Sequence, residues 1–333
     1  MMDRDGVDRE CHWRPTATWP ALRRRAALLA DIRRFFAALD VLEVETPVLS
    51  SAGTVDPHIE SVVGLVPLAG ADQPQRYFLH TSPEFAMKRL LAAGSGSIYQ
   101  ICKVFRGDDQ GRWHNPEFTL LEWYRVGFDH HQLMDEMDGF LAAVASLPVA
   151  ERLSYRAAFE RALGVDPLTC ELPHLMACAV TAGCVPEGDF ARRAQRDDWL
   201  DLLMSVAVGP KLGWARPTFI YDYPASQAAL ARVDPSPPAT ARRFEVYVKG
   251  VELANGFHEL TDADEQSRRF RADVARRRAA GQSPVPSDER LLAALRFGMP
   301  PCAGVALGID RLLMVMLAAA SIDDVLAFPI DRA

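Results

Sequence analysis

Two glutamates on either side of a short turn are placed to hold a cation together. In FEVYVKGVELANGFHEL, a two-residue turn at Lys249 and Gly250 would fold the flanking segments into a β-hairpin. That pairing puts Glu245 opposite Ala254 and makes Glu252 its diagonal neighbour on the same face. Carboxylates this close repel each other unless a cation bridges them, and their hard oxygens suit Mg²⁺. The sequence therefore predicts a magnesium site at the two glutamates, of the kind that serves a polyphosphate.

A run of small residues, 254–256, follows the second glutamate. Small residues favour β-bulges, and a bulge in this run would shift the alternation of side chains by one position. Asn255, Phe257 and Glu259 would then turn to the same face as the two carboxylates. We expect these three side chains to line the same site.

A second polar face is predicted on the segment FTLLEWYR. Side chains of a strand alternate between its two faces, and the residues on one face are Phe118, Leu120, Glu122 and Tyr124. An unpaired glutamate on a central strand is costly to bury. Arg106 ends the preceding strand, IYQICKVFR, and would supply a fixed cation nearby. The pattern predicts a polar pocket, and it leaves open the alternative of a purely structural Arg–Glu ion pair.

Three further patterns carry weaker signals. In GVALGIDRL, the glycines lie four apart and Arg311 follows three residues later, but the spacing differs from the common nucleotide-binding loops. His130 and His131 are expected to begin a helix with solvated imidazoles. The six cysteines contain no C-x-x-C pair, so we expect reduced structural thiols.

Alternation and helical periodicity predict the elements that must position these residues. Strands are expected at 41–48, 76–80, 97–106 and 118–125, and on both sides of the hairpin turn between 243 and 259. Helices are expected at 21–39, 132–147 and 262–280, from a cap at Ser287 to 297, and after Arg311. The loop 107–117 is long for a hairpin, and such loops are often functional. No pattern in segment 148–224 predicts a catalytic or binding site.

Composition sets the class of protein. The 333 residues are 49% hydrophobic and 24% charged, as in a globular protein with a large core. We expect a flexible N-terminal segment at 1–17 and one catalytic domain at 18–333. The charged start and the short apolar stretch near the C-terminus predict a cytoplasmic protein without membrane spans. A net charge of −7 argues against a broad surface for nucleic acid, including tRNA.

Four segments, in this order, resemble the catalytic core of class II lysyl-tRNA synthetases: TSPEFAMKRL, VFRGDDQGRWHNPEFTLLEWY, FEVYVKGVELANGFHELTDADEQ and GVALGIDRL. The resemblance implies an α+β fold in which an antiparallel sheet is flanked by helices. It also implies a homodimer formed through residues 21–47, and activation of a lysine-like amino acid by ATP with Mg²⁺. The short stretch before the first helix leaves no room for the anticodon-binding barrel, an OB domain.

The resemblance assigns roles residue by residue. Arg106 and Arg311 resemble the catalytic arginines that neutralise the phosphates. The residues implied to bind ATP are Arg106, Gly107, Asp108, His114, Phe118, Glu252, Leu253, Gly308 and Arg311. Glu245 and Glu252 resemble the magnesium ligands. The amino-acid pocket would comprise Ser82, Pro83, Glu84, Glu122, Tyr124, Asn255, Phe257, Glu259 and Ala306. Three of these are carboxylates, which suits a substrate with two amino groups.

Two positions depart from the family pattern. Asp108 stands where a glutamate is usual, so its side chain is one methylene shorter. Ala306 stands where a glycine is usual, and its methyl group indicates a substrate whose backbone differs from that of α-lysine.

The missing anticodon domain makes the chain similar to the free-standing members of the family, which transfer (R)-β-lysine to a lysine of elongation factor P. The alternatives are a truncated enzyme that charges tRNA and a lysine-binding regulator without catalysis. Retention of the Mg-ATP residues disfavours the regulator.

Overall fold

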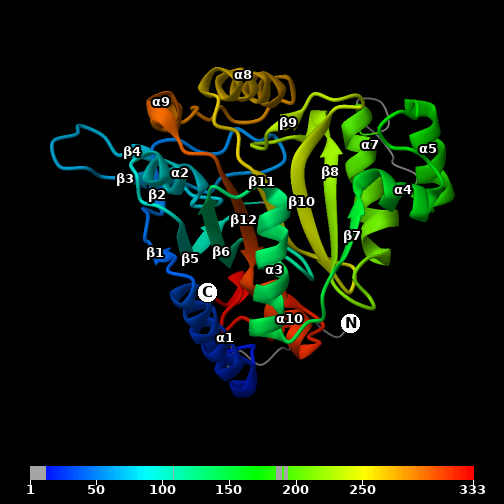
Figure 1. Cartoon of the computed structure of the whole chain (residues 1–333). Coiled ribbons are helices and arrows are strands. Elements are labelled where there is room, and N and C mark those ends of the chain that lie inside the picture. The colour runs from blue at the N-terminus through cyan, green and yellow to red at the C-terminus, as the bar shows by residue number, and fades with distance from the viewer. Residues whose placement is uncertain (1–12, 108, 185–189, 191–193) are drawn as a thin grey trace, which may run out of the picture.

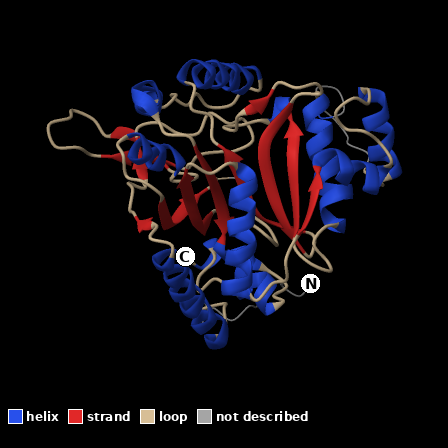
Figure 2. Ribbon diagram, in the orientation of Figure 1, coloured by secondary structure: helices blue, strands red, loops and turns tan. Residues whose placement is uncertain are grey.

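The computed structural model describes residues 13–107, 109–184, 190 and 194–333. Within this part of the chain, a nine-stranded sheet forms the centre (Figures 1 and 2). Its strands lie in the order β1 (Leu42–Glu43), β5 (Ile98–Phe105), β6 (Glu117–Val126), β12 (Cys302–Gly308), β11 (Val251–His258), β10 (Thr240–Val248), β8 (Thr218–Pro224) and β7 (Glu151–Ser154), with β9 (Val233–Asp234) paired to β10. Neighbours are antiparallel except β1 on β5 and β7 on β8. The expected α+β class with a helix-flanked, mainly antiparallel sheet is confirmed.

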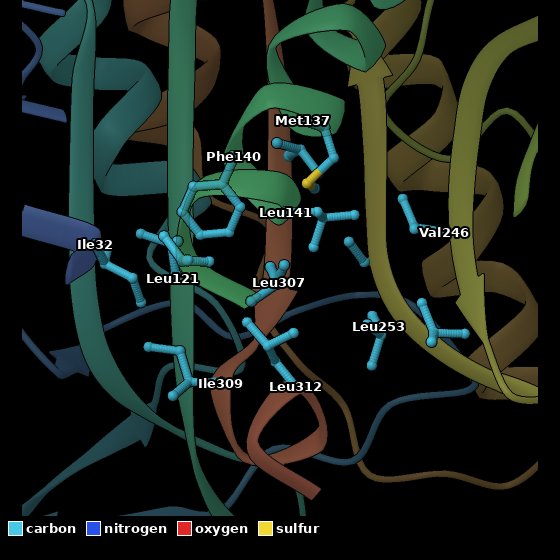
Figure 3. Close-up of a cluster of buried hydrophobic side chains, with 14 of the residues drawn as sticks. Ile32, Leu121, Met137, Phe140, Leu141, Val246, Leu253, Leu307, Ile309 and Leu312 are labelled. Carbon is cyan, nitrogen blue, oxygen red and sulfur yellow. The ribbon is translucent and has the colours of Figure 1, made fainter. Parts of the chain in front are cut away.

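One face of the sheet is covered by α1 (Trp19–Ala38), α3 (His130–Ala145) and α10 (Ile309–Leu317). Figure 3 shows side chains from these helices meeting side chains of the central strands, among them Phe140 of α3, Leu121 of β6 and Leu307 of β12. Each of the three is fully buried. Removing a buried leucine side chain of this kind costs about 2–5 kcal/mol, so this layer holds the strands rigidly.

The opposite face carries the polar side chains. Here α2 (Glu84–Ala92), α8 (Ala263–Ala279) and α9 (Glu289–Gly298) form a smaller apolar cluster that reaches the sheet at Ile98, Tyr124 and Cys302. A small sheet of β2 (Leu49–Ser50), β4 (Gln75–Leu79) and β3 (Val63–Val66) stands beside α2, and the loop between its last two strands projects at the left of Figure 1. The face is therefore covered at its margins and open along the middle strands.

Segment 155–211, which the sequence left without a role, builds a third layer against β8 and β10. It contains α4 (Tyr155–Leu163), α5 (Leu172–Thr181), α7 (Arg196–Leu203) and the short helices η2 (Met204–Val208) and η3 (Gly209–Lys211). Trp199, Leu200 and Phe159 pack with Ile220 and Tyr223 of β8 in a core of their own. Figure 1 shows this layer at the right of the sheet.

Several sequence predictions are confirmed closely. Thr18 caps α1 through its side chain, and α1 covers the predicted 21–39 helix. The turn at Lys249 and Gly250 has positive φ at both residues, 51° and 76°, as a two-residue hairpin requires. Asp262 caps α8, which matches the predicted 262–280 helix.

Three local predictions are wrong. No single strand spans 41–48; β1 and β2 are two residues each and join different sheets, because the chain leaves the large sheet before Pro47, which cannot donate a backbone hydrogen bond. Asp288 rather than Ser287 caps α9, with its carboxylate accepting from two backbone N–H groups. The third is wrong only in part: His130 begins α3 and His131 is exposed, as predicted, but the ring of His130 is buried beside the rings of His131 and His258.

The described ends of the chain meet. The backbone N–H groups of Thr16 and Ala17 donate to the carbonyls of Ala327 and Leu326, close to the short helices η5 (Ile322–Asp324) and η6 (Ile330–Arg332). The expected flexible segment 1–17 lies mostly outside the described residues. None of the described helices combines the length and the apolar character that a bilayer crossing requires.

Candidate active site

A cavity of about 780 Å³ opens on the polar face of the sheet, between α2, α8, the loop 50–59 and the loop that follows β5. It gathers most of the predicted site residues: Ser82, Pro83, Glu84, Arg106, His114, Phe118, Glu122, Tyr124, Glu252, Leu253, Asn255, Phe257, Glu259, Ala306, Gly308 and Arg311. Glu245 and Gly107 do not line it, and Asp108 lies outside the described residues. Gly107 instead donates its N–H to the carbonyl of Glu60, at 2.9 Å.

The predicted alternation on β6 holds. Phe118, Leu120, Glu122 and Tyr124 all face the cavity, whereas Leu121 and Trp123 join the opposite core.

The register of the hairpin differs from the prediction by one residue. Glu245 pairs with Asn255 rather than Ala254, because Leu253 is an extra residue on β11 and forms the bulge there. At the bulge Leu253 and Ala254 both pack in the core, and both also border the cavity. It lies one residue before the predicted run, and it has the predicted effect of directing Asn255, Phe257 and Glu259 into the cavity.

Two guanidinium groups mark one end of the cavity. Arg106 lies over the ring of Phe118, 5.1 Å from its centroid, and its Nε is buried with no hydrogen-bond partner among the described residues. Burial lowers the pKa of Arg106, an effect that a bound anion would reverse. No ion pair joins Arg106 to Glu122 in the described part of the chain, so the structural-pair alternative does not apply. A guanidinium with a buried N–H that makes no hydrogen bond suits a phosphate or a carboxylate.

Arg311, at the same end of the cavity, contacts two segments that are distant from it in the sequence. Its Nη1 donates to the carbonyl of Glu252 at 3.0 Å, and its Nη2 lies 2.6 Å from Nε2 of His114. Burial and the charge of Arg311 lower the pKa of His114, so a neutral imidazole accepts this hydrogen bond. Gly308 precedes Arg311 at the start of α10, where the backbone can approach a nucleotide closely. This end offers cations, an aromatic ring and a helix start.

The two predicted metal ligands differ in availability. Both oxygens of Glu245 are engaged, one by Nη2 of Arg243 at 2.5 Å and one by the hydroxyl of Tyr247 at 2.7 Å. The carboxylate of Glu252 faces the cavity, with Nη1 of Arg311 4.0 Å away. Although 41% of the Glu252 side chain is exposed, partial desolvation within the cavity, followed by the charge of Glu245, raises its pKa to about 7.

These groups fit a magnesium ion that is held mainly by phosphate oxygens and water. A carboxylate whose pKa is raised to about 7, like that of Glu252, needs a neighbouring cation to be fully ionised at neutral pH. Among the described residues no cluster of three or more histidine, cysteine or acidic side chains could enclose a metal by itself. Mg²⁺ in polyphosphate sites is commonly bound by one or two carboxylates together with the phosphates. Glu252 would hold such an ion directly, and Glu245 would add negative charge behind it.

A glutamate without a cationic partner occupies the other end of the cavity. Glu122 is almost fully buried, and its two oxygens accept hydrogen bonds from Ser82 Oγ and the Tyr124 hydroxyl, each at 2.6 Å. Burial, with a smaller effect from Glu84, raises the pKa of Glu122 to about 7. An ammonium group placed here would restore the ionised carboxylate.

Sequence reasoning missed Lys88, which changes the charge of this pocket. Its Nζ lies 2.6 Å from Glu84 and 2.6 Å from Glu259, and only 1% of its side chain is exposed. The two carboxylates raise the pKa of Lys88, so it remains an ammonium. The spacing of Glu84 and Lys88, four apart on one helix, is the signal that could have identified the pair. Burial also raises the pKa of Glu259, to about 8. With a cationic ligand bound and all three carboxylates ionised, one ammonium would leave two negative charges to face the ligand.

Small residues on β12 set the floor of the pocket. Ala306 pairs with Asn255 on one side and Glu122 on the other. Gly304 also lines the cavity, and a Cβ there would lie 2.3 Å from the Tyr124 ring and 2.5 Å from Glu259. Glycine at 304, another residue that the sequence analysis did not assign, therefore makes room for the two groups that define the acidic end.

Known proteins resemble this sequence along nearly the whole chain. The sequence pattern of the tRNA synthetases class II (D, K and N) matches residues 8–332. A Vibrio cholerae protein named elongation factor P--(R)-beta-lysine ligase is 53% identical over 96% of this chain and 98% of its own length. Proteins of the same name from Photobacterium profundum and Salmonella arizonae are 52% and 49% identical over 96% of this chain, and over 99% and 98% of their own lengths. The chain belongs to the class II tRNA synthetase (D, K and N) family.

Proposed function

We propose that this enzyme activates (R)-β-lysine with ATP as an aminoacyl-adenylate and transfers the β-lysyl group to a lysine side chain of elongation factor P. The observation that carries the proposal is the division of the cavity into a cationic end and an acidic end. The acidic end places three carboxylates beside one ammonium, so that with a cationic substrate bound and the carboxylates ionised it would match the two ammonium groups of a lysine isomer. The names of the relatives support the β-isomer and the acceptor.

Activation needs no protein nucleophile. A carboxylate oxygen of the amino acid attacks the α-phosphorus, and the bond from that phosphorus to pyrophosphate breaks. Arg106 would bind the α-phosphate and the attacking carboxylate, because its buried Nε has no hydrogen-bond partner among the described residues. Arg311 would cover the adenine ring opposite Phe118, with His114 near the phosphates. Positioning and charge neutralisation supply the rate enhancement.

Magnesium, when bound, neutralises charge on the phosphate oxygens. Glu252 is the ligand that we propose for it, and Glu245 stands behind Glu252. Leu253 forms the bulge that separates the carboxylate-bearing turn from the amino-acid residues of β11. This bulge lets one strand serve both substrates.

The amino-acid pocket recognises the substrate by its charges. Glu122, supported by Ser82 and Tyr124, would take one ammonium group. Glu259 and Glu84, which share Lys88, would take the second, with Asn255 and Phe257 forming the side wall. The methyl group of Ala306 stands between Asn255 and Glu122, where it favours an amino group on the β-carbon over one on the α-carbon.

In the transfer step the acceptor amine attacks the acyl carbonyl carbon. A C–N bond forms, the C–O bond to AMP breaks, and AMP leaves with the electron pair. The protons lost by the acceptor ammonium pass to water.

The proposal is tested by two assays. ATP–pyrophosphate exchange with each lysine isomer measures activation, and we expect (R)-β-lysine to give the higher kcat/KM. Incubation of enzyme, Mg-ATP and radiolabelled β-lysine with elongation factor P or with total tRNA then reports the acceptor. Label on tRNA alone would favour the truncated synthetase, and binding without exchange would favour the regulator.

We further propose a homodimer, formed through α1 and the strand that follows it, and a single catalytic unit over 18–333. The dimer is supported by large apolar side chains exposed in this region, including Trp19 (69%) and Leu42 (57%). We also propose a cytoplasmic location, which the free thiols of the described cysteines support. Light scattering of the purified protein would measure the oligomeric state.

A further inference from the structure

The cavity extends beyond the residues that activation uses. This outer part, which we term the acidic lobe, is lined by four aspartates from three separate segments: Asp56 of the loop 50–59, Asp197 and Asp201 of α7, and Asp273 of α8. Figure 1 shows α7 and α8 reaching the same end of the central sheet. None of the four was assigned a role by the sequence.

The charges facing the lobe are predominantly negative. Arg276 of α8 pairs with Asp273 and lies within electrostatic reach of Asp56 and Asp197. His58 is the other ionisable base near these aspartates. Arg243 lies within electrostatic reach of Asp201. Four carboxylates therefore face two arginines and one histidine. Asp197 also accepts a hydrogen bond from Ser226 Oγ at 2.8 Å, which fixes its carboxylate at the cavity wall.

A buried, unsatisfied acceptor points to a ligand for this lobe. Gln227 lines the cavity, is only 9% exposed, and donates its amide N–H to Asp201 Oδ1 at 2.8 Å. Its Oε1 is buried without a hydrogen-bond partner among the described residues. A buried carbonyl oxygen without a donor is costly, so such a group indicates a missing partner. Burial also raises the pKa of Asp201 to about 6, and this effect outweighs the opposing charges of Arg243 and His58.

The lobe is joined to the amino-acid pocket by one side chain. Arg243 donates from Nη1 to the backbone carbonyl of Gln227 at 3.0 Å and from Nε to Asn255 Oδ1 at 3.2 Å. Gln227 and Asp201 thus stand one guanidinium away from the wall of the pocket where the acyl group would form. A long, thin side chain entering past Asp201 would approach that acyl group.

We infer that the acidic lobe is the binding site for the acceptor's lysine side chain, with Asp201, Asp197 and the Gln227 carbonyl receiving its ammonium group before transfer. The inference rests on the proposed function and specifies which residues admit the acceptor. A ligand that only donates hydrogen bonds and carries positive charge matches a surface of carboxylates and an amide oxygen. The acidic lobe also assigns a function to the layer 155–211, because α7 supplies two of the four carboxylates.

The test compares Asp201→Asn and Asp197→Asn with a control, Asp264→Asn, which removes an exposed carboxylate from the first turn of α8. Asparagine keeps the size of the side chain, so the fold is retained, and circular dichroism checks this. Exchange of ATP with pyrophosphate is measured without an acceptor, and transfer of label is measured over a range of elongation factor P concentrations. We expect Asp201→Asn to raise the KM for the acceptor about tenfold, with exchange and the control unchanged.

A second acceptor separates failure of this inference from failure of the proposed function. If wild-type enzyme labels no elongation factor P, the proposed acceptor is wrong, and the same variants are assayed with Nα-acetyl-lysine methylamide as the amine. A raised KM for that amine in Asp201→Asn would support the lobe as a lysine site. An unchanged KM for the acceptor would overturn the inference, and so would a parallel loss of exchange and transfer, because the lobe would then serve activation.

Discussion

Replacing Lys88 with methionine tests the charge arrangement of the amino-acid pocket most directly. Methionine fills a similar volume but leaves Glu84 and Glu259 without the ammonium that now lies 2.6 Å from each. Removing one partner of a buried ion pair typically costs about 3–5 kcal/mol, because the remaining charge is uncompensated. Both carboxylates belong to the pocket, so we expect a loss near the upper end of this range at pH 7.

Urea denaturation followed by circular dichroism measures that loss. The matched control is Lys103→Met, since Lys103 pairs with Glu117 at 3.3 Å and both side chains are nearly half exposed. An exposed pair contributes about 0–1 kcal/mol, so the control should be close to wild type. Equal losses of stability in the two variants would show that the buried ion pairs of Lys88 stabilise the fold no more than an exposed ion pair does.

The loss should also depend on pH. In Lys88→Met the unpaired carboxylates are buried, so their pKa values in the folded state rise above those of the unfolded chain. Protonated carboxyl groups need no counter-ion, and the deficit is therefore small below the unfolded pKa and grows as pH rises through the folded pKa. We expect a smaller deficit at pH 5 than at pH 8. A deficit that stayed constant would show that lost packing, rather than charge, causes the effect.

Three further outcomes are expected. Glu252→Ala should abolish ATP–pyrophosphate exchange in a folded protein, because it removes the carboxylate that faces the phosphates; near wild-type exchange would reject the metal assignment. Binding of (R)-β-lysine should strengthen from pH 6 to pH 8, since Glu122 has a pKa of about 7 and must be ionised to pair with an ammonium. Titration calorimetry measures this, and Glu122→Gln should flatten the profile. Ala306→Gly should shift the ratio of kcat/KM values toward α-lysine by ~1–3 kcal/mol, and an unchanged ratio would contradict the role of the methyl group.

Alternation and turn chemistry predicted much of the site. The face of β6 that carries Glu122 and Tyr124 follows from a period of two, and the turn at Lys249 and Gly250 follows from the backbone freedom that glycine provides. These features depend only on neighbouring residues. The resemblance to a known family added the prediction that segments distant in the sequence meet in one cavity.

What could not be predicted depends on contacts between distant segments. The bulge falls at Leu253 because the core accepts that side chain together with Ala254, and no local pattern specifies this. Lys88 reads as one basic residue on an amphipathic helix until α2 packs beside the end of β11, which brings Glu259 to it. The carboxylates of α7 were overlooked for the same reason, since the layer 155–211 has its own core and its place against β8 is set by packing.

The buried ion triplet at Lys88 also bears on the enzyme's selectivity between amines. An enzyme that forms a reactive acyl group next to one of its own lysines risks acylating itself. An ammonium has no lone pair with which to attack, and the two carboxylates hold Lys88 in that form. The remaining lysines, Lys103, Lys211 and Lys249, do not line the cavity. The pocket thus leaves an incoming acceptor amine without an internal competitor for the acyl group.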